Sequence, residues 1–281
     1  MLYKFIGDSC SDLTERQKKD PHYHIVPLTL QIGSYHVSDD ENFDRADFLK
    51  RVADSPEGAK TACPSPELFK KAYEGEEECI FVVTISEHLS GTYQSAILAK
   101  QLYEEEHGNA KKILVLSSHS AASGQTRIFL ELEKLIAEGL SFEEISERIL
   151  RFRESLKTYF VLESLETLRK NGRLSGLSAF FATKLNIKPV MGAREGKILK
   201  LDQARGINKA LVRMVEFALK EAEEGAEEQI AVLSMVNNKE RGEFVAKLLR
   251  ESKRFKEVIL TEAAGVTTVY ACDGGIVLGI A

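Results

Sequence analysis

Short apolar runs alternate with amphipathic segments through the first half of the chain. Runs such as YKFIG from Tyr3, CIFVVTI from Cys79 and KILVLSS from Lys112 are compact and rich in β-branched residues, which favours buried strands. Between them, apolar residues recur at helical spacing, as from Tyr93 to Tyr103. The repeated order of strand and helix is typical of βαβ units. We therefore expect a doubly wound α/β fold with a parallel sheet.

Local signals predict where several of these elements begin and end. The run HIVPLTLQI from His24 predicts one strand. Asp12 and Glu15 resemble a capping box at the start of a first helix. Ser65 followed by Pro66 predicts another helix start, and Gly139 predicts the end of the helix that begins near Gly124.

The pattern changes after a charged helix expected from about Phe142 to Thr158. Short strands such as YFVLESL, NIKPVM, KILKLDQA and QIAVLSM follow, with turns and two further helices between them. Antiparallel pairing with helices on one face is the simpler expectation for such a pattern. We predict two domains, an α/β domain over residues 1–158 and an α+β domain with a mostly antiparallel sheet over residues 159–281.

Composition narrows the function classes. The 281 residues are 43% apolar and 29% charged, enough for at least one full core, and the net charge is −5. Basic residues are scattered among acidic ones, so the sequence offers little for nucleic acid to bind. Four cysteines without a CxxC pair favour a reducing, cytoplasmic setting. No apolar run approaches the roughly 20 residues of a membrane span.

Hydroxyls gather where the strand ending near Ile85 gives way to a helix. The segment TISEHLSGTYQSA contains Ser86, Ser90, Thr92 and Ser95. Free N–H groups at a helix start attract carboxylates and phosphates, so these residues are candidates for an anion site. Helix capping by Ser90 alone is the simpler alternative. A G-x-S-x-G nucleophile elbow is absent, which disfavours acyl transfer.

Two other segments follow predicted strands. In DSCSDL, Asp8 and Asp12 could hold a metal, although it is simpler that Asp12 caps the next helix and that Asp8 and Ser9 bind loop amides. In KTACPSP, two prolines would hold Thr61 in a defined place, and an equal alternative is that the prolines only begin a helix. No nucleotide-binding glycine motif or metal-ligand spacing occurs, so we expect no cofactor and no metal.

Two arginines stand out from the other basic residues. Arg173 follows a predicted helix end in LRKNGRLSG, where its guanidinium could face a carboxylate, a phosphate or a partner. Arg205 in DQARGINKAL is predicted to lie at a helix start, where a cation does not help stability. We interpret His88 as a loop residue unless it reaches Ser90.

Taken in order, these motifs resemble the DegV family of bacterial fatty-acid-binding proteins. The resemblance rests on DSCSDL, VPL from Val26, TACPSP, TISEHLSGTYQSA, LRKNGRLSG, KPV from Lys188 and the glycine-rich C-terminus, and it spans almost the whole chain. It implies a two-domain α/β protein that buries one long-chain fatty acid. Family members with an assigned role are the lipid-binding subunit of fatty acid kinase, and a separate kinase subunit phosphorylates the bound acid to an acyl phosphate.

The resemblance also implies roles for particular residues. Thr61 and Ser90 would bind the fatty-acid carboxylate, with Gly91 and Thr92 at the same helix start. Arg173 and Arg205 would serve docking or phosphate-proximal roles with the kinase. We therefore expect a non-enzymatic, cytoplasmic lipid carrier whose partners are a fatty acid and a kinase subunit.

Two departures from the family pattern leave alternatives open. The family's C-terminal His-x-Gly-Pro corresponds here to CDGG, so Cys272 stands in the position of the family histidine, and Ala62 replaces a serine. A family member that has lost lipid binding is therefore one alternative. Another is an enzyme that acts on a small carboxylate or phosphorylated substrate at the same sheet edge. A long apolar pocket favours the carrier, whereas a narrow polar pocket with paired titratable groups favours the enzyme.

Overall fold

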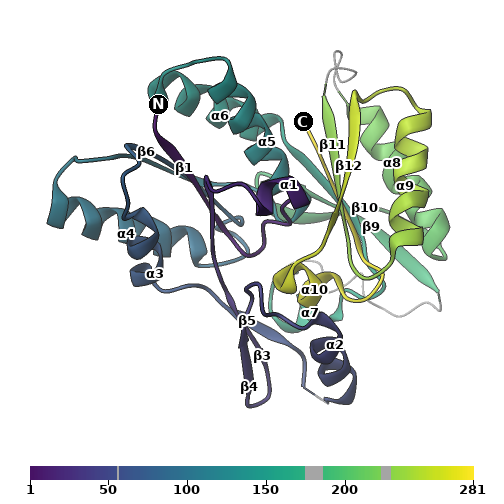
Figure 1. Cartoon of the computed structure of the whole chain (residues 1–281). Coiled ribbons are helices and arrows are strands. Elements are labelled where there is room, and N and C mark those ends of the chain that lie inside the picture. Colours follow the sequence, from purple (N-terminus) through teal and green to yellow (C-terminus); the bar gives the residue numbers. More distant parts are fainter. Residues whose placement is uncertain (56, 175–185, 223–228) are drawn as a thin grey trace.

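Two large β-sheets dominate the fold (Figure 1). The computed structural model describes residues 1–55, 57–174, 186–222 and 229–281. One sheet is entirely parallel and the other is mostly antiparallel, which confirms the predicted fold class.

The first sheet has four parallel strands in the order β2-β1-β6-β7. These are β1 (Tyr3–Asp8), β2 (Tyr23–Val26), β6 (Cys79–Thr84) and β7 (Lys112–Ser117). The core on one face contains residues of α3 (Pro66–Tyr73) and α4 (Thr92–His107), and that on the other contains residues of α5 (Ser123–Ala137) and α6 (Phe142–Ser155). Because both faces are covered, Phe81 and Val82 are both fully buried and face opposite layers, which explains the continuous apolar run.

The run HIVPLTLQI forms two strands, so the prediction of a single strand is wrong. Pro27 has no N–H to donate to a ladder and lies between β2 and β3 (Thr29–Ile32). Beyond it the chain enters a three-stranded antiparallel sheet that sequence analysis did not predict, in the order β4-β3-β5. Its other elements and the helix between them are β4 (Tyr35–Ser38), α2 (Arg45–Asp54) and β5 (Lys60–Ala62).

The second large sheet has the order β10-β9-β8-β13-β11-β12, and among its described strands only β11 and β12 pair in parallel. Its strands are β8 (Lys157–Val161), β9 (Ile187–Arg194), β10 (Lys197–Arg205), β11 (Ile230–Met235), β12 (Glu257–Glu262) and β13 (Ile276–Ile280). Helices α8 (Ile207–Glu221) and α9 (Lys239–Glu251) cover one face. Two short helices, α7 (Glu166–Lys170) and α10 (Gly265–Ala271), lie at one end of the sheet (Figure 1).

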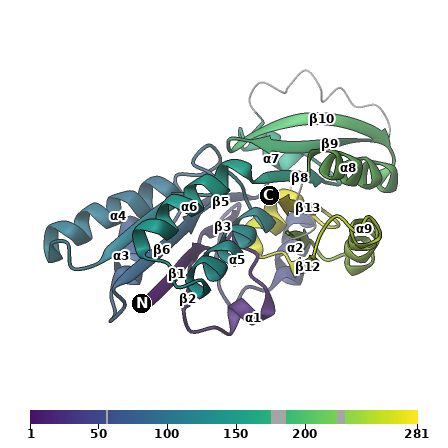
Figure 2. The same ribbon diagram turned by 90° about the horizontal axis from the view of Figure 1, so that it is seen from above.

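The two large sheets meet through α5, which lies between them (Figure 2). Its first turn packs against β13 so closely that a Cβ atom on Gly279 would lie 3.0 Å from the backbone nitrogen of Gly124. The chain changes sheet between Ser155 and Lys157. This supports our proposal of a domain boundary near residue 158.

Two helix ends differ from the sequence predictions. Thr14 and Gln17 form the capping box of α1 (Glu15–Lys18), so Asp12 and Glu15 do not. Helix α6 ends at Ser155 rather than near Thr158, because Leu156 is extended and leads directly into β8.

The other two end signals are confirmed. Ser65 is the N-cap of α3 with a proline at the first helical position. Gly139 follows the C-cap of α5 with a φ of 75°. None of the helices in the described ranges is long and apolar enough to cross a membrane.

Candidate functional site

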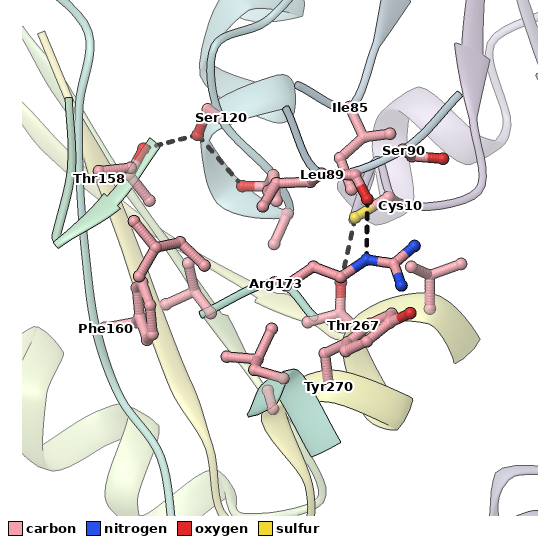
Figure 3. A pocket seen from close by; sticks show the side chains of 18 of the residues that line it. Cys10, Ile85, Leu89, Ser90, Ser120, Thr158, Phe160, Arg173, Thr267 and Tyr270 are labelled. Carbon is pink, nitrogen blue, oxygen red and sulfur yellow. Dashed lines mark hydrogen bonds between the residues drawn. The ribbon is translucent and has the colours of Figure 1, made fainter. Parts of the chain in front are cut away.

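A cavity lies where the carboxyl edge of the parallel sheet faces the second sheet (Figure 3). Its volume is about 90 Å³, room for on the order of six to nine water-sized groups. Apolar side chains from many elements form most of the wall, including Leu28, Ile85, Phe160, Leu168, Ile198 and Val277. The cavity is therefore suited to an apolar ligand.

Strand alternation explains why the second sheet presents an apolar wall. On β8, Tyr159 and Val161 pack among the residues of α8 and α9, whereas Thr158 and Phe160 face the cavity. Val277 of β13 likewise faces the cavity, and its two neighbours face the helices. A strand buried on both faces needs apolar residues at consecutive positions. One hydroxyl pair interrupts this wall, where Ser120 Oγ and Thr158 Oγ1 lie 2.6 Å apart.

Four polar side chains, Thr61, Ser90, Arg173 and Tyr270, form what we call the polar end of the cavity. Thr61 Oγ1 lies 3.0 Å from the Tyr270 hydroxyl. The Arg173 guanidinium carbon lies 5.8 Å from the centre of the Tyr270 ring, and its Nε donates to the carbonyl oxygen of Leu89, the neighbour of Ser90, at 3.0 Å. Residues predicted from separate segments thus meet at one place.

Helix α4 begins almost where the sequence predicted. Its N-cap is Gly91, one residue after Ser90, and no side chain makes a standard cap. Ser90 Oγ instead lies 2.8 Å from Thr92 Oγ1. Ser90 lines the cavity, whereas the next two residues, Gly91 and Thr92, are not among the residues of its wall.

The other hydroxyls of this segment point elsewhere. Ser86 Oγ donates to the carbonyl oxygen of Gly196 at 3.0 Å, which ties the loop after β6 to the turn between β9 and β10. Ser95 Oγ lies 4.0 Å from Cys63 Sγ. The His88 imidazole makes no hydrogen bond to Ser90 among the described residues, which leaves His88 as a loop residue.

Two buried aspartates hold the first turn of α10. Asp12 Oδ1 accepts from the N–H of Ala264 at 2.8 Å and from the Thr267 hydroxyl at 3.1 Å. The two oxygens of Asp39 accept from the N–H groups of Gly265 and Val266, both at 2.8 Å. Sequence analysis expected Asp12 to cap the next helix along the chain, and this is wrong, because Asp12 serves a helix about 250 residues away.

Burial raises the pKa values of these carboxyl groups against the effect of their hydrogen bonds. Loss of solvation raises the pKa of Asp12 to about 7 and that of Asp39 to about 6. Asp12 Oδ2 has no hydrogen-bond partner among the described residues, so a proton there would leave the bonds to Oδ1 intact.

Asp8 and Ser9 bind loop amides, as the simpler interpretation predicted. Asp8 accepts from the N–H groups of Cys10 and Ile85 at 3.0 and 2.6 Å, and Ser9 Oγ accepts from the N–H of Leu28 at 3.0 Å. Burial raises the pKa of Asp8 to about 6. Within the described part of the chain, no group of three or more His, Cys, Asp or Glu residues could hold a metal ion.

Arg205 and Cys272 lie away from the cavity wall. Arg205 is the last residue of β10, just before the N-cap of α8, and its exposed side chain borders a shallow depression with Lys209 and Arg213. Cys272 is the C-cap of α10, and its Sγ lies 3.8 Å from Thr167 Oγ1. Burial raises the pKa of the Cys272 thiol.

Two residues of the site, Tyr270 and Asp39, were not predicted from the sequence. Tyr270 occurs in the apolar segment GVTTVYA, which reads as an ordinary helix, and Asp39 follows a strand in a charged loop. Their roles depend on contacts with Thr61 and α10, which are distant in sequence. No local pattern could have identified them.

Comparisons with known proteins agree with this fold. A model of the family described as "Uncharacterised protein, DegV family" matches residues 3–281. A DegV domain-containing protein of Streptococcus pyogenes is 35% identical, and the match covers 99% of both chains.

Two solved structures resemble the chain along its length. One is a DegV family protein from Ruminococcus gnavus with vaccenic acid, which is 42% identical with a TM-score of 0.95 and 99% of each chain covered. The other is the fatty acid kinase (Fak) B3 protein of Streptococcus pneumoniae, loaded with linoleic acid. It is 34% identical with a TM-score of 0.90, and the match covers 100% of this chain and 99% of that one.

Proposed function

This chain belongs to the DegV family, and we propose that it binds one long-chain fatty acid with the acyl tail in the cavity. The observation that carries the proposal is a mostly apolar wall with Thr61, Ser90, Arg173 and Tyr270 at its polar end. An amphiphile with one small polar head matches this distribution. The related proteins with vaccenic and linoleic acids support the same ligand class.

Burial of the tail supplies the affinity. Each buried CH₂ contributes about 0.8 kcal/mol, so about 15 methylenes contribute on the order of 10 kcal/mol before the costs of binding. The cavity of about 90 Å³ holds roughly half that many groups. We therefore expect apolar side chains such as Phe160 to change rotamer when the tail enters.

The head group is proposed to lie at the polar end. Thr61 and Ser90 would donate to the carboxylate, with the start of α4 at Gly91 and Thr92 behind them. Arg173 would supply positive charge, since its Nη2 has no acceptor among the described residues.

We further propose that the protein presents the bound acid to a separate kinase subunit and has no catalytic role of its own. The similarity to the fatty acid kinase (Fak) B3 protein supports this step. Exposed Arg205, with Lys209 and Arg213 beside it, offers a basic surface for such a partner. A cytoplasmic location follows from this role.

Native mass spectrometry of protein purified from a bacterial host tests the proposal. We expect the mass of one bound long-chain acid, and a higher melting temperature when such an acid is added to stripped protein. Absence of both effects would refute lipid binding and would favour the alternative of a family member that has lost it. Stabilisation only by a short carboxylate or a phosphorylated compound would favour the enzyme alternative.

A further inference from the structure

We propose that Tyr270 binds the fatty-acid head group together with Thr61. The inference rests on the proposed function and names a ligand-binding residue that the sequence motifs do not contain. Three observations carry it: an unused hydroxyl hydrogen, the placement of charge, and the way α10 is held.

The first observation is a count of hydrogen bonds at the polar end. Thr61 and Tyr270 each have one hydroxyl hydrogen, and the single bond between the two oxygens, 3.0 Å long, uses only one of them. No described residue accepts the other hydrogen. Both side chains line the cavity, so the unused donor borders the space that a ligand would occupy. A carboxylate has only acceptor atoms and can take hydrogen bonds from both hydroxyls at once.

The second observation concerns charge. The Arg173 guanidinium lies over the ring of Tyr270 at 5.8 Å, and two of its nitrogens already donate to backbone carbonyl oxygens of Leu89 and Asn171. These bonds fix the group but do not neutralise it. Its remaining nitrogen, Nη2, has no acceptor among the described residues. An anion bound by Tyr270 and Thr61 would therefore lie near a fixed and uncompensated positive charge.

Cys272 does not replace the missing imidazole. It lies outside the described wall of the cavity, and its sulfur contacts Thr167 Oγ1 at 3.8 Å and the carbonyl oxygen of Val269 at 3.9 Å. Tyr270, two residues earlier on α10, has the longer side chain and does reach the wall. Tyr270 rather than Cys272 can therefore contact a ligand in the cavity.

The third observation is that α10 is held rigidly by other parts of the chain. Asp12 and Asp39 accept from three consecutive N–H groups at its first turn. The contact is close, since a Cβ atom on Gly265 would lie 2.4 Å from Asp39 Oδ1. Tyr270 is therefore positioned before the ligand arrives, which lowers the entropic cost of binding.

The test compares a long-chain fatty acid with its methyl ester, which keeps the tail but has no charge. Affinities for stripped full-length protein are measured by isothermal titration for the wild type, Tyr270→Phe and Thr61→Val. A hydrogen bond to a charged group changes affinity by about ten- to a hundredfold. We expect Tyr270→Phe to weaken binding of the acid by at least about tenfold and binding of the ester much less, because the ester carbonyl accepts only a weaker, uncharged hydrogen bond.

Tyr3→Phe is the matched control. The Tyr3 hydroxyl makes no hydrogen bond among the described residues, and Tyr3 begins β1, whereas the cavity lies at the carboxyl end of the strands. The double variant of Tyr270 and Thr61 shows whether Tyr270 acts only by orienting Thr61. If so, Tyr270→Phe would have no effect in a Thr61→Val background, and the proposal would be wrong.

Equal binding of the acid by wild type and Tyr270→Phe would also overturn the inference, as would an equal loss for acid and ester. These results differ from failure of the proposed function, in which the wild type itself binds neither ligand.

Discussion

Replacement of Asp12 by asparagine should raise the free energy of unfolding at pH 8 and change it much less at pH 5. In the folded protein burial raises the pKa of Asp12 to about 7, whereas an unfolded aspartate has a pKa of about 3.9. The folded state therefore holds about one more proton than the unfolded state between these values. The contribution of Asp12 to the free energy of unfolding is therefore highest below the unfolded pKa and is lost as the pH rises through the folded pKa.

The magnitude follows from linkage. With one extra proton bound in the folded state, the free energy of unfolding falls by about 1.4 kcal/mol per pH unit, so Asp12 contributes about 2 to 3 kcal/mol more at pH 5 than at pH 8. Asparagine keeps one oxygen for Ala264 and Thr267 but places an NH₂ group where Oδ2 has no partner. An unsatisfied donor costs about 1–3 kcal/mol, but at pH 5 the protonated wild-type carboxyl has an O–H without an acceptor at the same place, so this cost largely cancels there.

We therefore expect Asp12→Asn to resemble the wild type in stability at pH 5 and to exceed it by about 2 to 3 kcal/mol at pH 8. Urea unfolding at pH 5, 6, 7 and 8 measures both proteins. Asp8 and Asp39 titrate in both, so their contributions cancel in the difference. The exposed Asp54→Asn is the control and should show a constant difference. A constant difference for Asp12→Asn as well would refute the reasoning.

Three further changes test the packing, the head-group site and the docking surface. Gly279→Ala should lower the free energy of unfolding by about 1–3 kcal/mol, because its methyl group would meet the backbone of Gly124. Gly58→Ala is the control, since its methyl group would meet only the flexible side chain of Lys170. Equal losses for the two variants in urea unfolding would contradict this. Ser90→Ala should weaken fatty-acid binding by about tenfold with little change in melting temperature, and unchanged affinity in titration would show that the head group lies elsewhere. Arg205→Glu should reduce acyl phosphate formation in a coupled assay with a fatty acid kinase while acid binding stays intact, and full activity would exclude a docking role.

Local pattern marked several residues of the candidate site, and the resemblance to the DegV family implied their roles. Thr61, Ser90 and Arg173 each occur in a motif with its own turn or helix signal, and all three line the cavity. The alternation of strands and helices similarly predicted the parallel sheet. These features depend on neighbours within a few residues, so the sequence displays them directly.

Predictions from local pattern were wrong where a residue caps a helix, or a strand pairs, with a segment distant in the sequence. The capping box belongs to Thr14 rather than Asp12, because Asp12 points to α10 across the fold. The strand from His24 divides because its second half pairs with β5, which brings Thr61 beside Tyr270.

The sequence by itself determined the fold class, the start of α3, the end of α5 and the motifs of the DegV family. Only the tertiary structure decided which face of each strand lines the cavity, how three buried carboxyl groups are used, and that Tyr270 reaches Thr61. The physical reason is that backbone propensity and hydrophobic period are local properties, whereas desolvation and hydrogen-bond partners depend on segments that meet only in the folded chain.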